Sequence, residues 1–266
     1  MELNLTHKHV LITGGSKGIG LACAKVFLEE GCKVSLVSRN PVTLESAKKQ
    51  LSTQVPGSQD RIALFSADVQ KAESAEEALN AAEKTFGAID VLVNSAGAAK
   101  RTPAESLSPA FFREAMDAKF FTYINMIDPV IKRMGARGTG VIVNVVGSGG
   151  KVPSTPHIAG GSANAALMLT TAGLAAAYGP KGVRINAVNP SGTLTDRLIE
   201  GLKVNADHEK ISQEEVLKRM TAQVPMGRLA SPEEVADTVV YLASNRASYV
   251  TGAILTMDGA AHPCVV

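Results

Sequence analysis

The chain has 266 residues, of which 45% are hydrophobic and 20% are charged, a composition typical of a folded globular protein and not of a disordered one. Its 27 Lys and Arg side chains against 25 Asp and Glu side chains leave a net charge of +2, too little to indicate a nucleic-acid partner. This length favours one large α/β unit, so we expect a single domain over residues 1–266.

The cysteine spacing and the N-terminal sequence provide information on the cellular compartment. Cys23, Cys32 and Cys264 form neither a CxxC pair nor an even set, so we expect no metal site and no disulfide framework. The N-terminus lacks a basic segment followed by an apolar run, which is the pattern of a secretory signal. The longest apolar stretch, 165–177, is interrupted by threonine and glycine and is too short to span a bilayer. We therefore predict a cytoplasmic protein with no membrane partner.

Short β-branched runs alternate with helical stretches along the chain. The runs expected to form buried strands are 10–12, 33–37, 61–65, 89–93, 140–145, 183–188 and 253–257. The expected helices are 18–30, 43–51, 72–86, 109–134 and 162–178, with a last one that begins after an N-cap at Ser231 and ends near 243. This alternation predicts a doubly wound parallel sheet, a Rossmann fold, of about seven strands with helices on both faces.

One polar segment, residues 195–227, interrupts the alternation late in the chain. In a doubly wound sheet, an insertion after a late strand lies beyond the carboxyl ends of the strands, where ligands bind. We expect this segment to be a substrate lid. Leu198, Ile199 and Leu202 would give it an apolar wall, which suggests a partly apolar small-molecule substrate.

The first predicted strand ends in a glycine-rich run that passes directly into a helix. Gly14 permits a tight turn, Gly18 lets backbone N–H groups approach a phosphate, and Gly20 permits close packing of helix on strand. Glycines are also common in ordinary turns, but here strand, glycines and helix occur in the order that a dinucleotide site requires. The predicted phosphate-binding residues are Gly14, Ser16, Lys17, Gly18, Ile19 and Gly20.

The residues after the second strand bear on the choice of cofactor. An NAD-selective fold usually places a carboxylate there to hold the ribose 2′-hydroxyl, whereas this chain has Ser38 and Arg39. Arg39 can pair bidentately with a 2′-phosphate, and Lys17 adds a second positive charge. We therefore predict NADP(H) in preference to NAD(H). The alternative is that Arg39 and Lys17 are only solvated surface charges.

Several motifs, in order along almost the entire chain, resemble the short-chain dehydrogenase/reductase family. The glycine run has that family's TGxxxGxG spacing, the segment 86–97 resembles its fourth-strand signature, and 182–190 resembles its sixth strand. The resemblance implies an oxidoreductase that forms a homodimer or homotetramer through the helices at 109–134 and 165–177. It also implies further cofactor contacts: Asp68 and Val69 at the adenine, Asn94, Ala96 and Gly97 at the ribose, and Pro190, Thr193 and Thr195 at the nicotinamide carboxamide.

The residues expected to move protons depart from the family's pattern. The family usually carries a Tyr-x-x-x-Lys pair at the start of the helix after strand five, whose Tyr exchanges a proton with the substrate oxygen. None of the four tyrosines of this chain is followed four residues later by Lys. Aligned with that helix start, Gly160 occupies the Tyr position and Asn164 the Lys position. In turn, Lys119 stands in an earlier helix where the family usually has Asn.

We hypothesise that Lys119 supplies the missing ammonium from the opposite wall, and that Asn164 hydrogen-bonds the nicotinamide ribose. The other catalytic candidates are Ser148, one residue after the family's usual Ser position, and His157, whose ordinary pKa is near neutrality. Each has a plainer alternative: Lys119 extends to solvent, Ser148 only forms a turn, and His157 is structural.

Three functions remain open, because function depends on the site and not on the fold. The first is an NADP(H)-dependent oxidoreductase that moves hydride to or from a carbonyl or alcohol with a reorganised proton donor. The second is a catalytically impaired NADP-binding protein with a binding or sensing role. The third is a lyase or isomerase that keeps the nucleotide as structure. A carboxamide clamp and a lid favour the enzyme.

Overall fold

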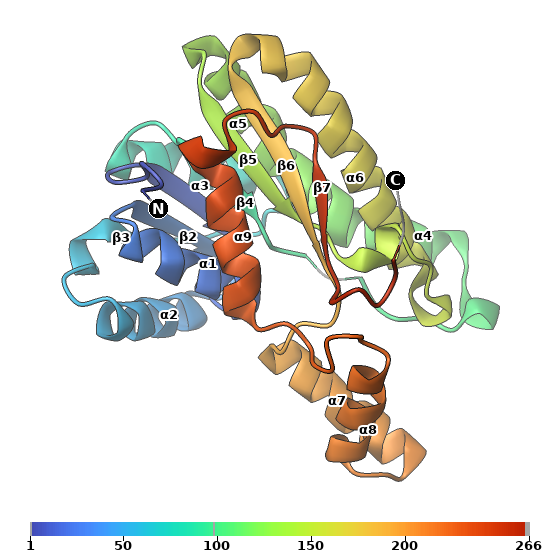
Figure 1. Ribbon diagram of the computed structural model, residues 1–266. Helices are drawn as coiled ribbons and strands as arrows, with labels where there is room; N and C mark the ends of the chain where they lie inside the picture. The colour runs from blue at the N-terminus through green and yellow to red at the C-terminus, as the bar shows by residue number, and fades with distance from the viewer. Residues whose placement is uncertain (1, 98, 264–266) are drawn as a thin grey trace.

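The computed structural model describes residues 2–97 and 99–263, so Cys264 lies outside the described residues. Its strands form one parallel sheet in the order β3-β2-β1-β4-β5-β6-β7 (Figure 1). The strands are β1 His9–Thr13, β2 Lys33–Ser38, β3 Ile62–Ser66, β4 Val91–Asn94, β5 Gly140–Val145, β6 Val183–Pro190 and β7 Ile254–Met257. The predicted doubly wound fold is confirmed. The strand order reverses between β1 and β4, and ligands bind such sheets at this switch point.

Helices cover both faces of the sheet and bury two separate hydrophobic clusters (Figure 1). The first cluster lies under α1 Gly18–Glu29, α2 Pro41–Gln54 and α9 Pro232–Ala243. The second lies under α3 Ala72–Phe86, α5 Thr122–Arg137 and α6 Ile158–Tyr178. All residues of β1 are buried, because a strand covered on both faces has no solvated side.

The helix predicted over 109–134 is interrupted. It consists of α4 Pro109–Ala115, a π-helical segment Met116–Phe121, and α5. Within the wider turn, the Thr122 hydroxyl donates to the Asp117 carbonyl at 3.1 Å. The apolar periodicity of the sequence did not reveal this interruption. π-Helical turns are frequent at functional sites.

Helix α6 begins at Ile158, four residues before the predicted start at 162. Gly160 and Gly161 weaken the helix signal in the sequence, but both are buried in the first turns. A Cβ on Gly161 would lie 2.6 Å from the Gly149 carbonyl oxygen. Glycine at 161 therefore lets the helix approach the loop after β5.

Together with the turn that follows it, α6 forms a segment of 24 residues, Ile158–Lys181, with a mean hydropathy of 1.2. By length and composition it could cross a membrane, so the expectation that this stretch is too short is wrong. Half of the segment's most apolar part is buried inside the protein, and the Thr171 hydroxyl donates to the Leu167 carbonyl at 2.8 Å. This environment is typical of the core helix of a folded domain.

The predicted lid is a pair of helices, α7 Asp196–Glu209 and α8 Gln213–Ala222, which projects from the carboxyl end of β6 (Figure 1). Leu202 packs with Ala206 and Val216 in a small cluster of the pair's own. The prediction that Leu202 lines an apolar substrate wall is therefore wrong, since its side chain is only 5% exposed. The role of this hairpin as a lid stays a prediction.

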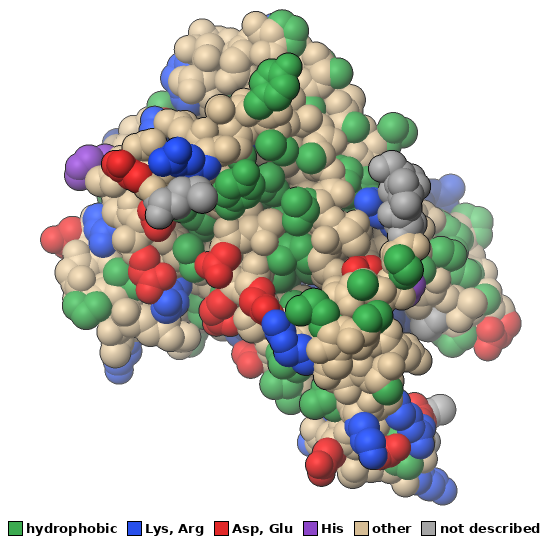
Figure 2. Space-filling model, viewed as in Figure 1, with side chains coloured by type: hydrophobic (Ala, Val, Ile, Leu, Met, Phe, Trp, Pro, Cys, Tyr) green, Lys and Arg blue, Asp and Glu red, His purple; other side chains and the backbone are tan. Residues whose placement is uncertain are grey.

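Basic and acidic side chains are intermingled over the visible face of the molecule, and neither sign forms a continuous patch there (Figure 2). This distribution agrees with the small net charge of +2.

Candidate active site

The turn between β1 and α1 is built on glycines. Gly14 and Gly18 have φ angles of +67° and +52°, which side chains rarely adopt. A Cβ on Gly14 would lie 2.9 Å from the Ala96 backbone nitrogen, and one on Gly20 would strike the Gly14 carbonyl. A Cβ on Gly18 would lie 3.3 Å from Thr195 Cγ2. The fold thus brings the glycine turn against both the end of β4 and the N-terminus of α7.

The polar residues of the turn face the end of β2. The Ser16 hydroxyl donates to the Ser38 hydroxyl at 3.0 Å, and the Ser66 hydroxyl donates to the Arg39 carbonyl, also at 3.0 Å. Lys17 and Arg39 are exposed, and neither forms an ion pair with any residue that the structure describes. Both cations are therefore available to a bound anion.

A cleft of about 470 Å³ borders this turn. Its lining includes Ser16, Lys17 and Gly18 from the turn, Thr43 from α2, and Thr195 from the N-cap of α7. The cleft thus borders three of the residues that the sequence assigns to the phosphates, and the rest of its lining comes from α1, α2, the segment at the start of α7 and the start of α9.

The end of β4 is held by a chain of buried polar side chains. Asn94 Nδ2 donates to Asn144 Oδ1, and Asn144 Nδ2 donates to the Thr171 hydroxyl, each at 3.0 Å. The Asn94 amide nitrogen is therefore taken by Asn144, whereas its Oδ1 is buried and has no hydrogen-bond partner among the described residues. Ser95 and Ala96 are fixed as well, because their backbone N–H groups donate to Thr13 Oγ1 at 3.1 and 3.2 Å.

Asn144 and Thr171 were not among the residues expected from the sequence. Asn144 could have been recognised, because it is a polar residue inside the otherwise apolar run 140–145. Asn125 on α5 was not expected either. Asn125 Nδ2 donates to the carbonyl oxygens of Val69 and Gln70, both at 3.0 Å. Together with the hydrogen bond from the Gln70 N–H to Asp68 Oδ1 at 3.3 Å, this contact fixes the segment assigned to the adenine.

The residues assigned to the nicotinamide carboxamide follow Pro190, the last residue of β6. The Thr193 hydroxyl donates to the Ser191 carbonyl at 3.3 Å, and Thr193 is nearly buried by its bridge to Ala230. The Thr195 hydroxyl accepts from the Leu198 N–H at 3.3 Å and so caps α7. Residues far apart in sequence, Gly18 and Thr195, therefore face the same cleft.

Lys119 lies in the π-helical segment beside the end of β4. Gly97 has a φ of +118°, and a Cβ on it would lie 2.7 Å from the Ala118 carbonyl oxygen and 3.4 Å from Lys119 Cα. Only glycine at 97 allows this approach. The backbone of residue 119 is thereby set directly against the loop that the sequence assigns to the ribose.

The Lys119 ammonium has an unusual environment. The side chain is half-buried, its Nζ lies 5.6 Å from the centre of the Tyr123 ring, and it forms no ion pair with a described residue. Burial, and after it the positive charge of Arg197, lower the pKa of Lys119 to about 8. This lysine can therefore exchange a proton near neutral pH.

Asn164 and Ser148 lie on the other side, where α6 meets the loop after β5. Asn164 is 3% exposed, and its Nδ2 lies 3.3 Å from the position that a Cβ on Gly147 would take. Its Oδ1 is buried and has no hydrogen-bond partner among the described residues. Ser148 is half-buried. Asn164 therefore presents an unpaired acceptor close to a glycine-lined loop.

None of the four tyrosines lies at the start of α6, where the family resemblance implies one. The Tyr123 hydroxyl donates to the Val145 carbonyl at 2.6 Å and is buried, which raises its pKa. Tyr178 is at the far end of α6, and Tyr241 and Tyr249 are 40% and 102% exposed. The titratable candidates that remain near the loop are Lys119 and His157, and the pKa of His157 is lowered, first by burial and then by the charges of Arg101, Lys119 and Arg197.

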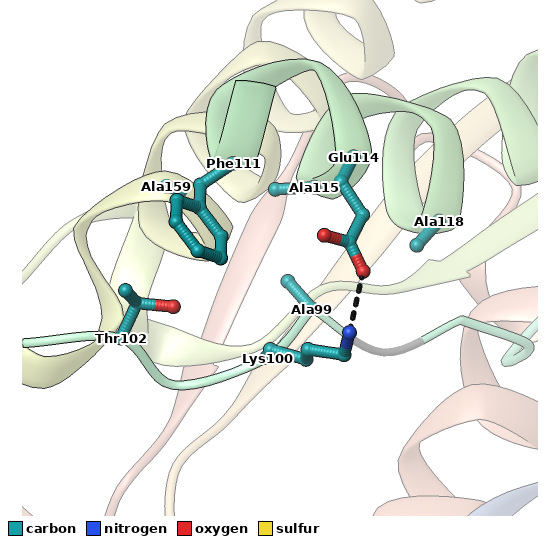
Figure 3. A pocket seen from close by; sticks show the side chains of 8 residues that line it. All are labelled: Ala99, Lys100, Thr102, Phe111, Glu114, Ala115, Ala118 and Ala159. Carbon is teal, nitrogen blue, oxygen red and sulfur yellow. Dashed lines mark ion pairs between the residues drawn. The ribbon is translucent and has the colours of Figure 1, made fainter. Parts of the chain in front are cut away.

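A small pocket of about 20 Å³ lies beside this region, between the loop after β4, α4 and the start of α6 (Figure 3). The ion pair between Lys100 and Glu114, at 2.9 Å, closes one side of it (Figure 3). Such a volume holds about one water molecule. The pocket is therefore too small for an organic substrate.

Comparisons with known proteins agree along nearly the whole chain. A family profile described as enoyl-(acyl carrier protein) reductase matches residues 14–262. The chain is 34% identical to the 3alpha-hydroxysteroid dehydrogenase of Mediterraneibacter gnavus over 263 residues, which cover 98% of this chain and 100% of that protein.

Solved structures give the same result. The fold is similar to that of L-sorbose reductase from Gluconobacter frateurii in complex with NADPH and L-sorbose, with a TM-score of 0.91, 28% identity, and coverage of 97% of this chain and 98% of the other. It is also similar to an NADPH-bound short-chain oxidoreductase from Pseudomonas aeruginosa PAO1 that contains an atypical catalytic center, with a TM-score of 0.85, 28% identity, and coverage of 95% of each chain.

Proposed function

The chain belongs to the short-chain dehydrogenase/reductase family, and from this premise we propose that it is an NADP(H)-dependent oxidoreductase acting on a partly apolar carbonyl or alcohol substrate. The observation that carries the proposal is the Lys119 ammonium, half-buried without a carboxylate partner beside the loop that is assigned to the ribose. A protein that only binds the dinucleotide has no need of a desolvated, titratable cation at that place.

The residues present fit the cofactor. The turn at Gly14 and Gly18 has no side chain that would block a phosphate. Strand β2 ends at Ser38 and is followed by Arg39, with no carboxylate there that would repel a 2′-phosphate. When bound, the nicotinamide supplies or accepts the hydride. Lys17 and Arg39 would pair with the phosphates, while Thr193 and Thr195 would orient the carboxamide. The NADPH bound by the sorbose reductase supports the same choice.

In the proposed mechanism Lys119 acts on the substrate oxygen. Its Nζ donates a hydrogen bond to that oxygen, and the positive charge stabilises the oxyanion as it develops during hydride transfer. A lysine with a pKa of about 8 is mostly protonated at pH 7 and can also release its proton during the reaction. Asn164, with its unpaired Oδ1, would accept a hydrogen bond from a ribose hydroxyl.

The second candidate is a catalytically impaired NADP-binding protein. The observation that favours it is the absence of any Tyr followed four residues later by Lys. The two candidates differ in turnover and not in binding, so activity has to be measured together with NADPH affinity.

The test is a panel of ketones, hydroxyketones and secondary alcohols, followed by absorbance at the nicotinamide band, with NADPH binding measured by fluorescence. Substitution Lys119→Met should lower kcat while NADPH still binds, and Lys119→Arg should retain part of kcat because it keeps the charge. A wild-type chain that binds NADPH tightly yet reduces and oxidises nothing in the panel would favour the second candidate.

We also propose a homodimer or homotetramer that uses α5 and α6. Leu169, on the outer side of α6, is 77% exposed, and Phe121, just before α5, is 44% exposed. Burial of such apolar side chains stabilises association. Light scattering on the purified chain measures the assembly, and a monomeric mass would contradict the proposal.

A further inference from the structure

The side chain missing at Gly160 is replaced in space by another residue. A Cβ on Gly160 would lie 2.9 Å from Ala99 Cβ and closer still to Cε1 and Nε2 of His157. The imidazole therefore occupies the volume into which any side chain at 160 would extend. A Cβ on Gly149 would lie 3.5 Å from His157 Cδ2, so the ring packs against two glycines.

Two polar atoms beside these glycines have no partner. His157 Nδ1 and Asn164 Oδ1 are both buried and unpaired among the described residues, and Asn164 Nδ2 lies 3.8 Å from the Cβ position of Gly149. Buried polar atoms are almost always hydrogen-bonded, and the exceptions call for a ligand or a water. Nδ1 lies among these buried atoms, whereas Nε2 is the ring nitrogen that lies over Gly160, where the family's proton-exchanging side chain is expected.

The charges that face His157 have one sign. They come from Arg101 in the loop after β4, from Lys119 in the π-helical segment, and from Arg197 at the start of α7. Burial and these three cations oppose a second positive charge on the ring, so the pKa of His157 lies below its ordinary value of 6.5. At neutral pH the imidazole is therefore uncharged, which is the form that accepts a proton.

We propose that His157, lodged in the space vacated at Gly160, is the base that removes the hydroxyl proton of an alcohol substrate. The inference rests on the proposed function. An oxidised nicotinamide bound in the cofactor site would accept the hydride released when the carbinol C–H bond breaks. The O–H proton moves to His157 Nε2, and the electron pair left on oxygen forms the carbonyl. Lys119 remains protonated and stabilises the oxygen during the step. In the reverse direction the imidazolium returns the same proton.

Substitutions of single glycines on α6 distinguish a catalytic base at His157 from a histidine with a purely structural role. In Gly160→Ala the new methyl group displaces the imidazole, so kcat for alcohol oxidation should fall about as far as in His157→Asn, by roughly 10²- to 10⁴-fold. The double variant should lose no more than either single one, because both changes remove the same group. The matched control is Gly173→Ala on the same helix, where a Cβ meets nothing within 4 Å, and its kcat should be unchanged.

The pH profile tests proton transfer directly. In the wild type, kcat/KM for alcohol oxidation should decline on the acid side with a pKa below 6.5, and this decline should be missing from the residual activity of His157→Asn. Imidazole added to His157→Gly should restore part of kcat. A purely structural histidine would give neither result.

A second readout needs no turnover. The His157 ring resonance, titrated by NMR in the chain without cofactor, should give a pKa below 6.5 that moves toward 6.5 in Gly160→Ala, because the displaced ring becomes hydrated. If the wild type turns over while His157→Asn and Gly160→Ala keep kcat within about twofold, the inference is overturned and the proposed function stands. If the wild type binds NADPH but turns over nothing, the proposed function falls and the base role falls with it.

Discussion

Replacing Lys119 by Met should stabilise the protein while it lowers activity. The fold holds the Lys119 ammonium in a half-buried place with no carboxylate partner, and Met has nearly the same length without the charge. A pKa lowered from 10.5 to about 8 corresponds to about 3 kcal/mol at about 1.4 kcal/mol per pKa unit. Because the side chain is only half-buried, solvent screening reduces this value. We expect Lys119→Met to gain about 1 to 3 kcal/mol in free energy of unfolding at pH 7.

The pH dependence of this gain follows from linkage. Between pH 8 and 10.5 the unfolded chain holds a proton on Lys119 that the folded chain has lost, so the stability of the wild type rises with pH over this interval. The Met variant has no such proton. Its advantage should therefore be full below pH 8 and should vanish as the pH approaches 10.5.

Urea denaturation of both proteins without cofactor, at pH 7 and at pH 10, measures both quantities. Activity of the same preparations separates stability from catalysis, and a more stable, less active variant is the expected pair of results. A Met variant that is no more stable than the wild type at pH 7, or whose gain is the same at both pH values, would refute the desolvation of Lys119.

Three further predictions concern the cofactor, a helix cap and a buried histidine. Arg39→Ser should weaken NADPH binding by about 10- to 100-fold, the value of one charge-assisted contact, and leave NADH binding unchanged; equal losses for both would contradict the 2′-phosphate role. Ser231→Ala removes the capping box of α9 and should cost about 1 kcal/mol in urea denaturation, whereas Ser108→Ala, where the side chain makes no cap hydrogen bond, should cost nothing measurable. The buried His9 ring lies between Gly87 O and Ser35 Oγ, and burial lowers its pKa. As the pH falls, His9 is therefore protonated in the unfolded chain before it is protonated in the folded one. The free energy of unfolding should be constant above pH 6.5 and should decrease below it. If the acid loss in a urea titration is no smaller in His9→Gln, His9 is not its source.

Local chemistry explains what was predictable from sequence. The alternation of apolar strands and helices depends on burial on both faces of the sheet, so it predicted the doubly wound fold. The glycine turn after β1 was recognisable because positive φ and close approach require glycine at 14, 18 and 20. The cap at Ser231 depends on neighbours within one helical turn.

Tertiary structure alone decided the features that join distant segments. Leu202 has the character of a pocket wall, yet it packs within the helical hairpin, because α7 and α8 bury their apolar faces against each other. Asn94 lies in a segment assigned to the ribose, yet its side chain is taken by Asn144 on the neighbouring strand. The local sequence around Leu202 or Asn94 does not reveal either of these partners.

The sequence by itself determined that this is a dinucleotide fold with no Tyr-x-x-x-Lys pair, since both depend on residue identity and spacing. Only the tertiary structure decided which side chains surround Gly160. It set Lys119 against Gly97 through a π-helical turn, and it laid the His157 ring over Gly160. The physical reason is that a glycine specifies only where volume is missing, whereas packing of elements distant in the chain determines which side chain fills it.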